Sequence, residues 1–227
     1  MSDVISVELL DSRTAVSEAL DESRANTRAD FFRKAIVGGG TFAAGGLLIT
    51  GLPSIALGQK SASQDAEILN FALLLEYLES EFYIEAVDRG ALSGETLEFA
   101  RVVRDHEVAH VEFLRTALGS SARAKPQFDF KGTTSDADQF RATSVVLEDT
   151  GVAAYNGQGT RLRRRTLPAA ASIVSVEARH AAWIRRIVGK PGYGNRAANY
   201  PAPAVLDPAL TQRQVEEAVG STGFIQG

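Results

Sequence analysis

The sequence predicts an all-α protein, a four-helix bundle with one long crossover between the second and third helices and an irregular C-terminal tail. Four segments place apolar residues at helical spacing, and strands with period-two alternation are not evident. A stretch without helical rhythm separates the second segment from the third. The chain has 227 residues, 44% of them hydrophobic, so it can bury one sizeable core.

The first two segments lie close together in the sequence. Residues 64–89 follow the cap-like Ser63 and end at Gly90, and residues 93–118 form the second segment. Residues 119–136 then contain glycine, proline and polar residues. A connection of this length is unusual in a compact domain unless it must cross the molecule. We therefore expect it to run along the bundle.

The third and fourth segments are residues 137–158 and 167–188, and Pro168 suits the first turn of the latter. Residues 189–227 hold four of the seven prolines. We expect them to form a tail that packs on the bundle, with a short helix at 211–219. Residues 59–188 would then be the folded domain.

Residues 1–58 differ from the rest of the chain. A basic flank at 27–34 precedes an uncharged, glycine-rich run at 35–58 that exits through small residues, as in a secretory signal. The flank resembles a twin-arginine export signal, although Ala29 stands where the second arginine belongs. We expect export to the periplasm or the cell exterior. The alternative is an uncleaved membrane anchor or a buried apolar helix, because the run is long enough to span a bilayer.

Composition restricts the chemistry available to the chain. The absence of cysteine excludes disulfides, thiolate metal sites and iron–sulfur centres. A formal charge of −4 provides no global attraction for nucleic acid, and the basic run at 161–165 lies near a predicted helix end, where basic side chains are favourable. We therefore expect no nucleic-acid partner.

The two halves of the predicted bundle repeat one pattern of residues. Each half has a glutamate seven residues before a tyrosine, followed on the next helix by a Glu-x-x-His motif. These residues are Glu76, Tyr83, Glu107 and His110 in the first half and Glu148, Tyr155, Glu177 and His180 in the second. Positions i and i+3 of a helix share a side, so the glutamate and histidine of each motif can reach one metal ion. Two such motifs and two further glutamates make up the ligand set of di-iron and di-manganese bundles.

Charge supports the same interpretation, because four buried carboxylates repel one another and two divalent cations neutralise them. Without metal, some of these carboxyl groups should have raised pKa values. Oxygen and imidazole donors suit iron or manganese. We expect the following roles: bridging for Glu107 and Glu177, terminal ligation for Glu76 and Glu148, and one imidazole per ion from His110 and His180.

Several nearby residues are candidates for supporting roles. Tyr83 and Tyr155, together with Asp105 and Asp149, are candidates to orient the imidazoles. The tyrosines are interpreted as hydrogen-bonded core residues in preference to redox participants. His106 is expected at the surface or behind the ligands. Glu79, like the other acids on these helices, is interpreted as a solvent-facing charge and kept only as a substitute ligand. 

These residues resemble the ferritin-like superfamily, and within it the exported, often desiccation-associated ferritin-like proteins. The resemblance covers residues 64–188 and is carried by Leu-Glu76-Tyr-Leu-Glu-x-x-Phe-Tyr83, Arg-Asp-His-Glu107-Val-Ala-His110, Leu-Glu148-Asp and Val-Glu177-Ala-Arg-His180. In that superfamily the glutamate seven residues before a tyrosine is the ligand of the first helix, which favours Glu76 over Glu79. The resemblance implies oxidation of iron(II), dismutation of peroxide on manganese, or oxygen activation.

Three functional hypotheses follow. The first is an oxidoreductase with two iron or manganese ions that reacts with oxygen or peroxide, as a ferroxidase or a peroxide-dismutating enzyme. The second is a non-catalytic, exported protein of stress or desiccation protection in which the metal only stabilises the bundle. The third is metal storage in a homo-oligomeric shell. In each of them the membrane would be contacted only through an uncleaved N-terminal segment.

Overall fold

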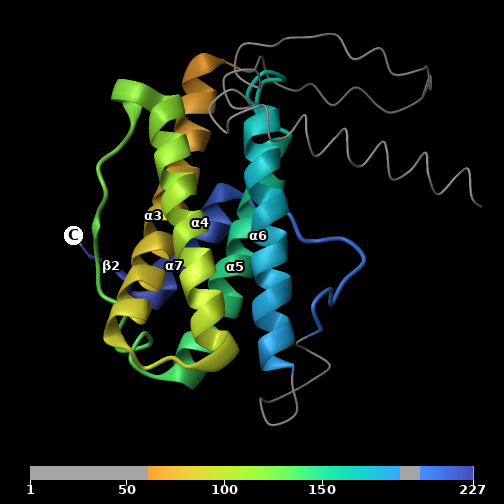
Figure 1. Cartoon of the computed structure of the whole chain (residues 1–227). Helices are drawn as coiled ribbons and strands as arrows, with labels where there is room; N and C mark the ends of the chain where they lie inside the picture. Colours follow the sequence, from red (N-terminus) through yellow and green to blue (C-terminus); the bar gives the residue numbers. More distant parts are fainter. Residues whose placement is uncertain (1–60, 190–199, 227) are drawn as a thin grey trace, which may run out of the picture. The chain divides into compact units, whose positions relative to one another are not determined.

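The computed structural model describes residues 61–189 and 200–226. Four long helices form a bundle: α3 (Ala62–Arg89), α4 (Gly94–Leu118), α5 (Ala137–Gly159) and α6 (Leu167–Val188) (Figure 1). Helix α3 packs mainly against α4, and α5 packs mainly against α6. The all-α prediction is confirmed, and the four helices match the predicted segments closely. The signal-like segment within residues 1–58 lies outside the described residues.

Local sequence explains where the helices begin and end. The side chain of Ser61, not Ser63, caps α3, because its hydroxyl accepts a hydrogen bond from the backbone of Gln64 at 3.0 Å. Gly90 ends the helix in the left-handed conformation, with a φ of 69° that favours glycine. Asp136 caps α5 by accepting from the backbone of Gln139 at 2.8 Å.

The crossover between α4 and α5 runs along the outside of the bundle (Figure 1). It contains the 3₁₀ helix η1 (Gly119–Ser121) and a two-residue strand, β1 (Gln127–Phe128). Asn70 on α3 holds its start, donating to the carbonyl of Ser121 at 2.9 Å and accepting from the backbone of Arg123 at 2.8 Å. Further along, the ring of Phe130 packs edge-on against Phe82, with centroids 5.4 Å apart. These contacts keep the crossover on α3.

The C-terminal segment completes the core. Helix α7 (Gln212–Thr222) begins with a capping box between Thr211 and Gln214, and it buries Val215 and Val219. The strand that follows, β2 (Ile225–Gln226), pairs antiparallel with β1. A helix was expected here, but the two-residue strands were not, because they are too short to show alternation. In Figure 1 the dark blue α7 lies behind the other helices.

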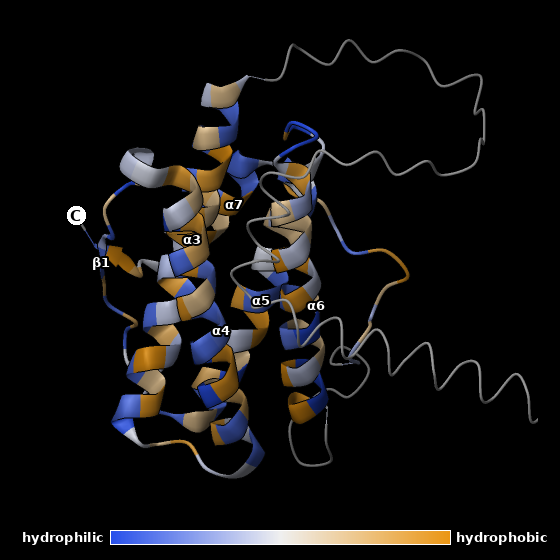
Figure 2. Cartoon of the chain, turned by 45° about the horizontal axis from the view of Figure 1, so that its top comes forward, coloured by the Kyte–Doolittle hydropathy of each residue, from blue (hydrophilic) through white to orange (hydrophobic). Residues whose placement is uncertain are grey.

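The hydropathy of the helices differs according to their surroundings. Figure 2 shows hydrophilic and hydrophobic residues sharing the long helices, as expected where one face is buried. Helix α3 is buried over most of its length because α4, α5 and the crossover surround it. Among residues 61–189 and 200–226, no helix has both the length and the apolar character needed to cross a membrane. The polar residues that α3 buries, such as Glu76, need specific partners inside the bundle.

Candidate metal centre

The bundle interior brings all six predicted ligand residues together. Helices α3 and α5 each contribute one glutamate, and α4 and α6 each contribute a Glu-x-x-His motif. The residues form two groups of four, within each of which one ligand atom per residue lies within 4.8 Å of the others: Glu76, Glu107, His110 and Glu177, and Glu107, Glu148, Glu177 and His180. The two groups share Glu107 and Glu177, the residues predicted to bridge. All four glutamates have no exposed surface.

Each imidazole faces the carboxylates through its Nδ1 atom. The Nδ1 atom of His110 lies 3.1 Å from one oxygen of each carboxylate in its group, Glu76, Glu107 and Glu177. The Nδ1 atom of His180 lies 3.0 Å from Glu107 and 3.2 Å from Glu148. The two imidazoles thus contact different oxygens of Glu107, so this carboxylate lies between them.

The two tyrosines make reciprocal contacts across the bundle. Tyr155 on α5 donates a hydrogen bond to Oε1 of Glu76 on α3 at 2.5 Å, and Tyr83 on α3 donates to Oε1 of Glu148 on α5. In each glutamate the other oxygen, Oε2, faces a histidine. The tyrosines therefore contact carboxylates and not the imidazoles that they were expected to orient.

His106 supports His180 from behind. Its Nδ1 atom lies 2.8 Å from Nε2 of His180, and the two rings stack with centroids 5.1 Å apart. Both expected locations for His106 apply, because the residue is exposed and also lies behind His180. Asp105 and Asp149 pair instead with Arg104 and Arg185. The suggestion that these aspartates orient imidazoles is wrong, because their carboxylates form ion pairs with arginines instead.

Glu79 differs most from its expected position. It is only 3% exposed, so its interpretation as a solvent-facing charge is wrong. It lies one helical turn after Glu76, beside Gly151 of α5, where an added Cβ atom would be 3.3 Å from Oε1 of Glu79 and 3.2 Å from Oε2 of Glu177. The i, i+3 spacing from Glu76 was the signal that could have placed Glu79 on the buried face.

The donor atoms of this cluster suit metal ions. Among the described residues, seven buried side-chain nitrogen or oxygen atoms make no hydrogen bond of suitable geometry, although some lie close to a charged group, and such atoms are unfavourable in a protein interior. Five of the seven belong to the two groups: Oε1 of Glu107, Oε2 of Glu148, both oxygens of Glu177 and Nδ1 of His180. Carboxylate oxygens and imidazole nitrogens converging in this way fit divalent cations.

Comparison with known proteins places the chain in a family. A family model described as a ferritin-like domain matches residues 64–190, which includes all but the first two residues of the four bundle helices and both halves of the ligand pattern. The chain belongs to the ferritin-like domain family. No curated protein matches the sequence significantly. The resemblance inferred from the motifs is confirmed at the level of the family.

Burial and mutual repulsion alter the pKa values of the acids in this ferritin-like domain. Burial, followed by the charge of Glu107, raises the pKa of Glu76 to about 8. Burial likewise raises the pKa values of Glu79, Glu148 and Glu177. The prediction of raised pKa values in the absence of metal is confirmed for Glu76, Glu148 and Glu177.

For Glu107 and the imidazoles, close contacts outweigh the effect of burial on the pKa. Burial alone would raise the pKa of Glu107, but close contacts with His110 and His180 hold it well below its usual range. Burial alone would lower the pKa of His180, yet the charge of Glu148 and contacts with Glu107 raise it to about 11. Without metal, imidazolium groups and bound protons therefore supply the positive charge that the cluster requires.

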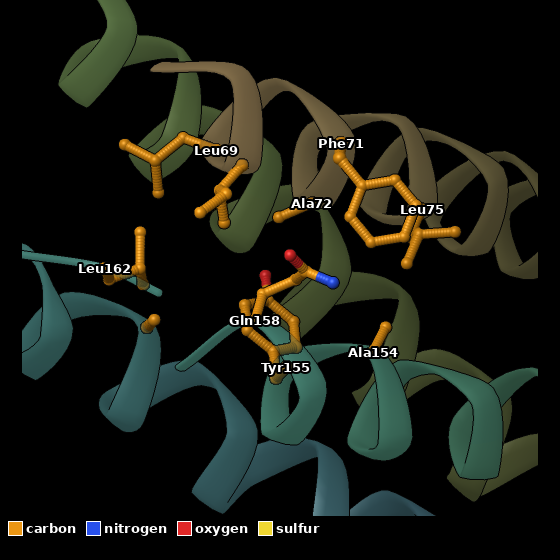
Figure 3. A pocket seen from close by; sticks show the side chains of 10 residues that line it. Leu69, Phe71, Ala72, Leu75, Ala154, Tyr155, Gln158 and Leu162 are labelled. Carbon is orange, nitrogen blue, oxygen red and sulfur yellow. The ribbon is translucent and has the colours of Figure 1, made fainter. Parts of the chain in front are cut away.

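An apolar cavity of about 10 Å³ lies beside Tyr155, between α3, α5 and α6 (Figure 3). Its walls include Leu69, Ala72 and Leu162, and Gln158 is the amide among them. The Oε1 atom of Gln158 accepts from Arg161 at 2.6 Å, whereas its Nε2 atom is buried without a partner. A volume of this size holds about one water molecule. The ferritin-like core is thus closely packed next to the candidate metal centre.

Proposed function

We propose that this ferritin-like domain binds two iron or manganese ions and acts as an oxidoreductase that reacts with oxygen or peroxide. The observation that carries the proposal is the pair of overlapping ligand groups that share Glu107 and Glu177. When bound, the metal pair supplies the two electrons that oxygen or peroxide accepts. The protein supplies the geometry and the electrostatic environment.

The residues would divide this work as follows. Glu107 and Glu177 would contact both ions, because each belongs to both groups. Glu76 and Glu148 would each hold one ion through Oε2, since a tyrosine hydroxyl already binds Oε1. His106 would keep the Nδ1 atom of His180 directed at the carboxylates by holding its Nε2 atom. Iron and manganese fit this set of oxygen and imidazole donors better than copper does.

The accessibility of the site supports a small oxidant. The side chain of His110 is 13% exposed, whereas that of His180 is 3% exposed and the glutamates have no exposed surface. Solvent therefore approaches the ligands most closely at His110 on α4. Such limited exposure suits oxygen or peroxide better than a bulky organic substrate.

Elemental analysis provides the first test. The protein would be purified without chelator or affinity metal from cells grown with iron and manganese, beside a variant with both Glu107→Ala and Glu177→Ala. The exposed Glu67→Gln change on α3 is a matched control. About two iron or manganese ions per chain, lost in the double variant and kept in the control, are expected. No metal in any of the proteins, and no uptake of added iron(II), would refute the proposal.

Turnover then separates the possible functions. A ferroxidase consumes oxygen when iron(II) is added, and a dismutase releases oxygen from peroxide. Bound metal without either reaction would favour the non-catalytic alternative, in which the ions only stabilise the bundle. A solution mass corresponding to a monomer or a dimer would exclude storage of a mineral core.

We also propose that residues 1–58 direct export, with cleavage before the bundle. The support is the order of basic flank, apolar run and small-residue exit in the sequence. N-terminal sequencing of the protein recovered outside the cytoplasm would identify a cleavage site near residue 58. Recovery of the full-length chain in the membrane fraction would indicate an anchor instead.

A further inference from the structure

The internal repeat is broken at its centre. Glu76 and Tyr83 on α3 have the same spacing as Glu148 and Tyr155 on α5, but the position equivalent to Glu79 is Gly151. Because Tyr155 contacts Glu76 and Tyr83 contacts Glu148, the two helices are antiparallel here. Glu79 and Gly151 therefore lie opposite each other, about midway between the two tyrosine–glutamate pairs.

The space at this midpoint accommodates one side chain. A Cβ atom on Gly151 would approach Oε1 and Oε2 of Glu79 to 3.3 and 3.7 Å and Oε2 of Glu177 to 3.2 Å. A glutamate at 151 would have to place its whole side chain where these carboxylates already lie. Glycine is unfavourable inside a helix, so its presence within α5 is explained by the room that it leaves for Glu79.

Glu79 is a buried acid without a positive partner. It is 3% exposed, and it has no hydrogen bond or ion pair with the residues that the structure describes. Asp65, another buried acid on α3, shows the usual solution: it accepts from the Nε atom of Arg163 at 2.8 Å and from the hydroxyl of Thr166. The carboxylate of Glu177 lies close to it, since one Cβ atom on Gly151 would be 3.3 Å from Oε1 of Glu79 and 3.2 Å from Oε2 of Glu177. In such surroundings the side chain either holds a proton or, when ionised, requires a nearby cation.

We infer that Glu79 is a fifth carboxylate of the metal centre, and that its charge favours the more oxidised state of the metal pair. This inference rests on the proposed function. Four carboxylates carry a charge of −4, which two divalent ions balance, whereas a fifth leaves negative charge in excess until the ions lose electrons. In a buried site of low dielectric constant that excess favours the oxidised pair strongly.

The test compares Glu79→Gln with Glu67→Gln after loading of the purified proteins with iron(II). Glutamine keeps the shape of Glu79 and removes its charge, and Glu67 is an exposed acid on the same helix. Metal content, iron affinity and the midpoint potential of the bound pair are measured. We expect Glu79→Gln to keep two ions, to bind iron at least about tenfold more weakly and to raise the potential. The Glu67→Gln protein should match the wild type.

The outcomes separate the two proposals. If wild-type protein binds two ions and Glu79→Gln changes neither affinity nor potential, the role of Glu79 is refuted while the metal centre stands. If the wild type binds no metal, the proposed function itself fails. A melting curve of the metal-free Glu79→Gln protein verifies folding, and we expect it to be at least as stable as the wild type because a buried charge has been removed.

Discussion

The hydroxyl of Tyr155 on α5 lies 2.5 Å from Oε1 of Glu76 on α3, and the hydroxyl of Tyr83 on α3 makes the equivalent contact with Glu148 on α5. The tyrosine of each half of the sequence repeat thus contacts, in the other half, the glutamate that is predicted to bind a single ion. This exchange makes the two candidate metal positions interdependent, because a change in either helix alters ligands on both.

Removal of one tyrosine hydroxyl should destabilise the metal-free protein. The change Tyr155→Phe leaves a buried carboxyl group of Glu76 without its donor, so we expect the free energy of unfolding to fall by about 1.5 kcal/mol. Urea unfolding measures this change. Tyr77→Phe on α3 is the control, since the Tyr77 hydroxyl lies 3.5 Å from its nearest acceptor, the carbonyl of Arg123. Equal losses in the two variants would contradict a specific role for the Tyr155 contact.

The stability of the metal-free protein should fall as the pH rises. The pKa of Glu76 is raised from 4.5 to about 8, so the folded chain holds a proton that the unfolded chain has released. The resulting stabilisation is present below about pH 4.5 and is lost as the pH rises through about 8. His180, with its pKa raised to about 11, acts in the same direction above its ordinary value of 6.5.

Urea unfolding from about pH 5 to about pH 9, with and without bound iron, tests this dependence. Metal ions replace the protons, so the loaded protein should show a weaker decline, and metal affinity should rise with pH. Metal-free stability that increased over this range would show that the acids of the cluster are ionised at low pH.

The change Gly151→Ala should separate helix stability from metal binding. Alanine is favoured over glycine inside a helix by about 1 kcal/mol. The added Cβ atom would nevertheless lie 3.2 Å from Glu177 and 3.3 Å from Glu79, displacing both carboxylates by a few tenths of an ångström. We expect metal-free melting to be unchanged or higher, while calorimetric titration shows weaker iron binding. Unchanged iron affinity would indicate that the carboxylates move without consequence.

Replacement of Gln158 by methionine should stabilise the fold. The Nε2 atom of Gln158 is buried without a partner, and such a group costs about 1–3 kcal/mol. The hydrogen bond that its Oε1 atom accepts comes from Arg161, an exposed residue, and contributes little. A gain of about 1 kcal/mol in urea unfolding is therefore expected. A loss of similar size would show that a water molecule satisfies the amide.

Gly157 should be essential for docking of the C-terminal segment. A Cβ atom at this position would lie 1.7 Å from the carbonyl oxygen of Leu210, whose backbone nitrogen donates to Ala153 at 3.0 Å. Gly157→Ala should therefore displace the segment that leads to α7. Hydrogen exchange at residues 212–222 would reveal this as faster exchange.

Gly159→Ala provides the matched control for that experiment. It adds the same methyl group to α5, but its nearest contact is the flexible side chain of Leu167 at 3.7 Å. Exchange in α7 should remain as in the wild type. Equal exchange in both variants would contradict the importance of the close approach at Gly157.

The sequence predicted the helices well because their signals are local. Apolar spacing, Pro168 near the start of α6 and the glycines that end the first two helices each act within a few residues. The start of α3 was less well placed, since Ser61 and Ser63 are both suitable caps and only the hydrogen bond to Gln64 distinguishes them.

The sequence by itself determined the six candidate ligands, because a repeated motif on helices fixes which side chains share a face. Only the tertiary structure decided the surroundings of those ligands. The burial of Glu79 depends on the lack of a side chain at Gly151, and the contact of His106 with His180 depends on how α4 meets α6. Such relationships join residues far apart in the chain, and helical periodicity specifies the direction of a side chain but not the residue that it meets.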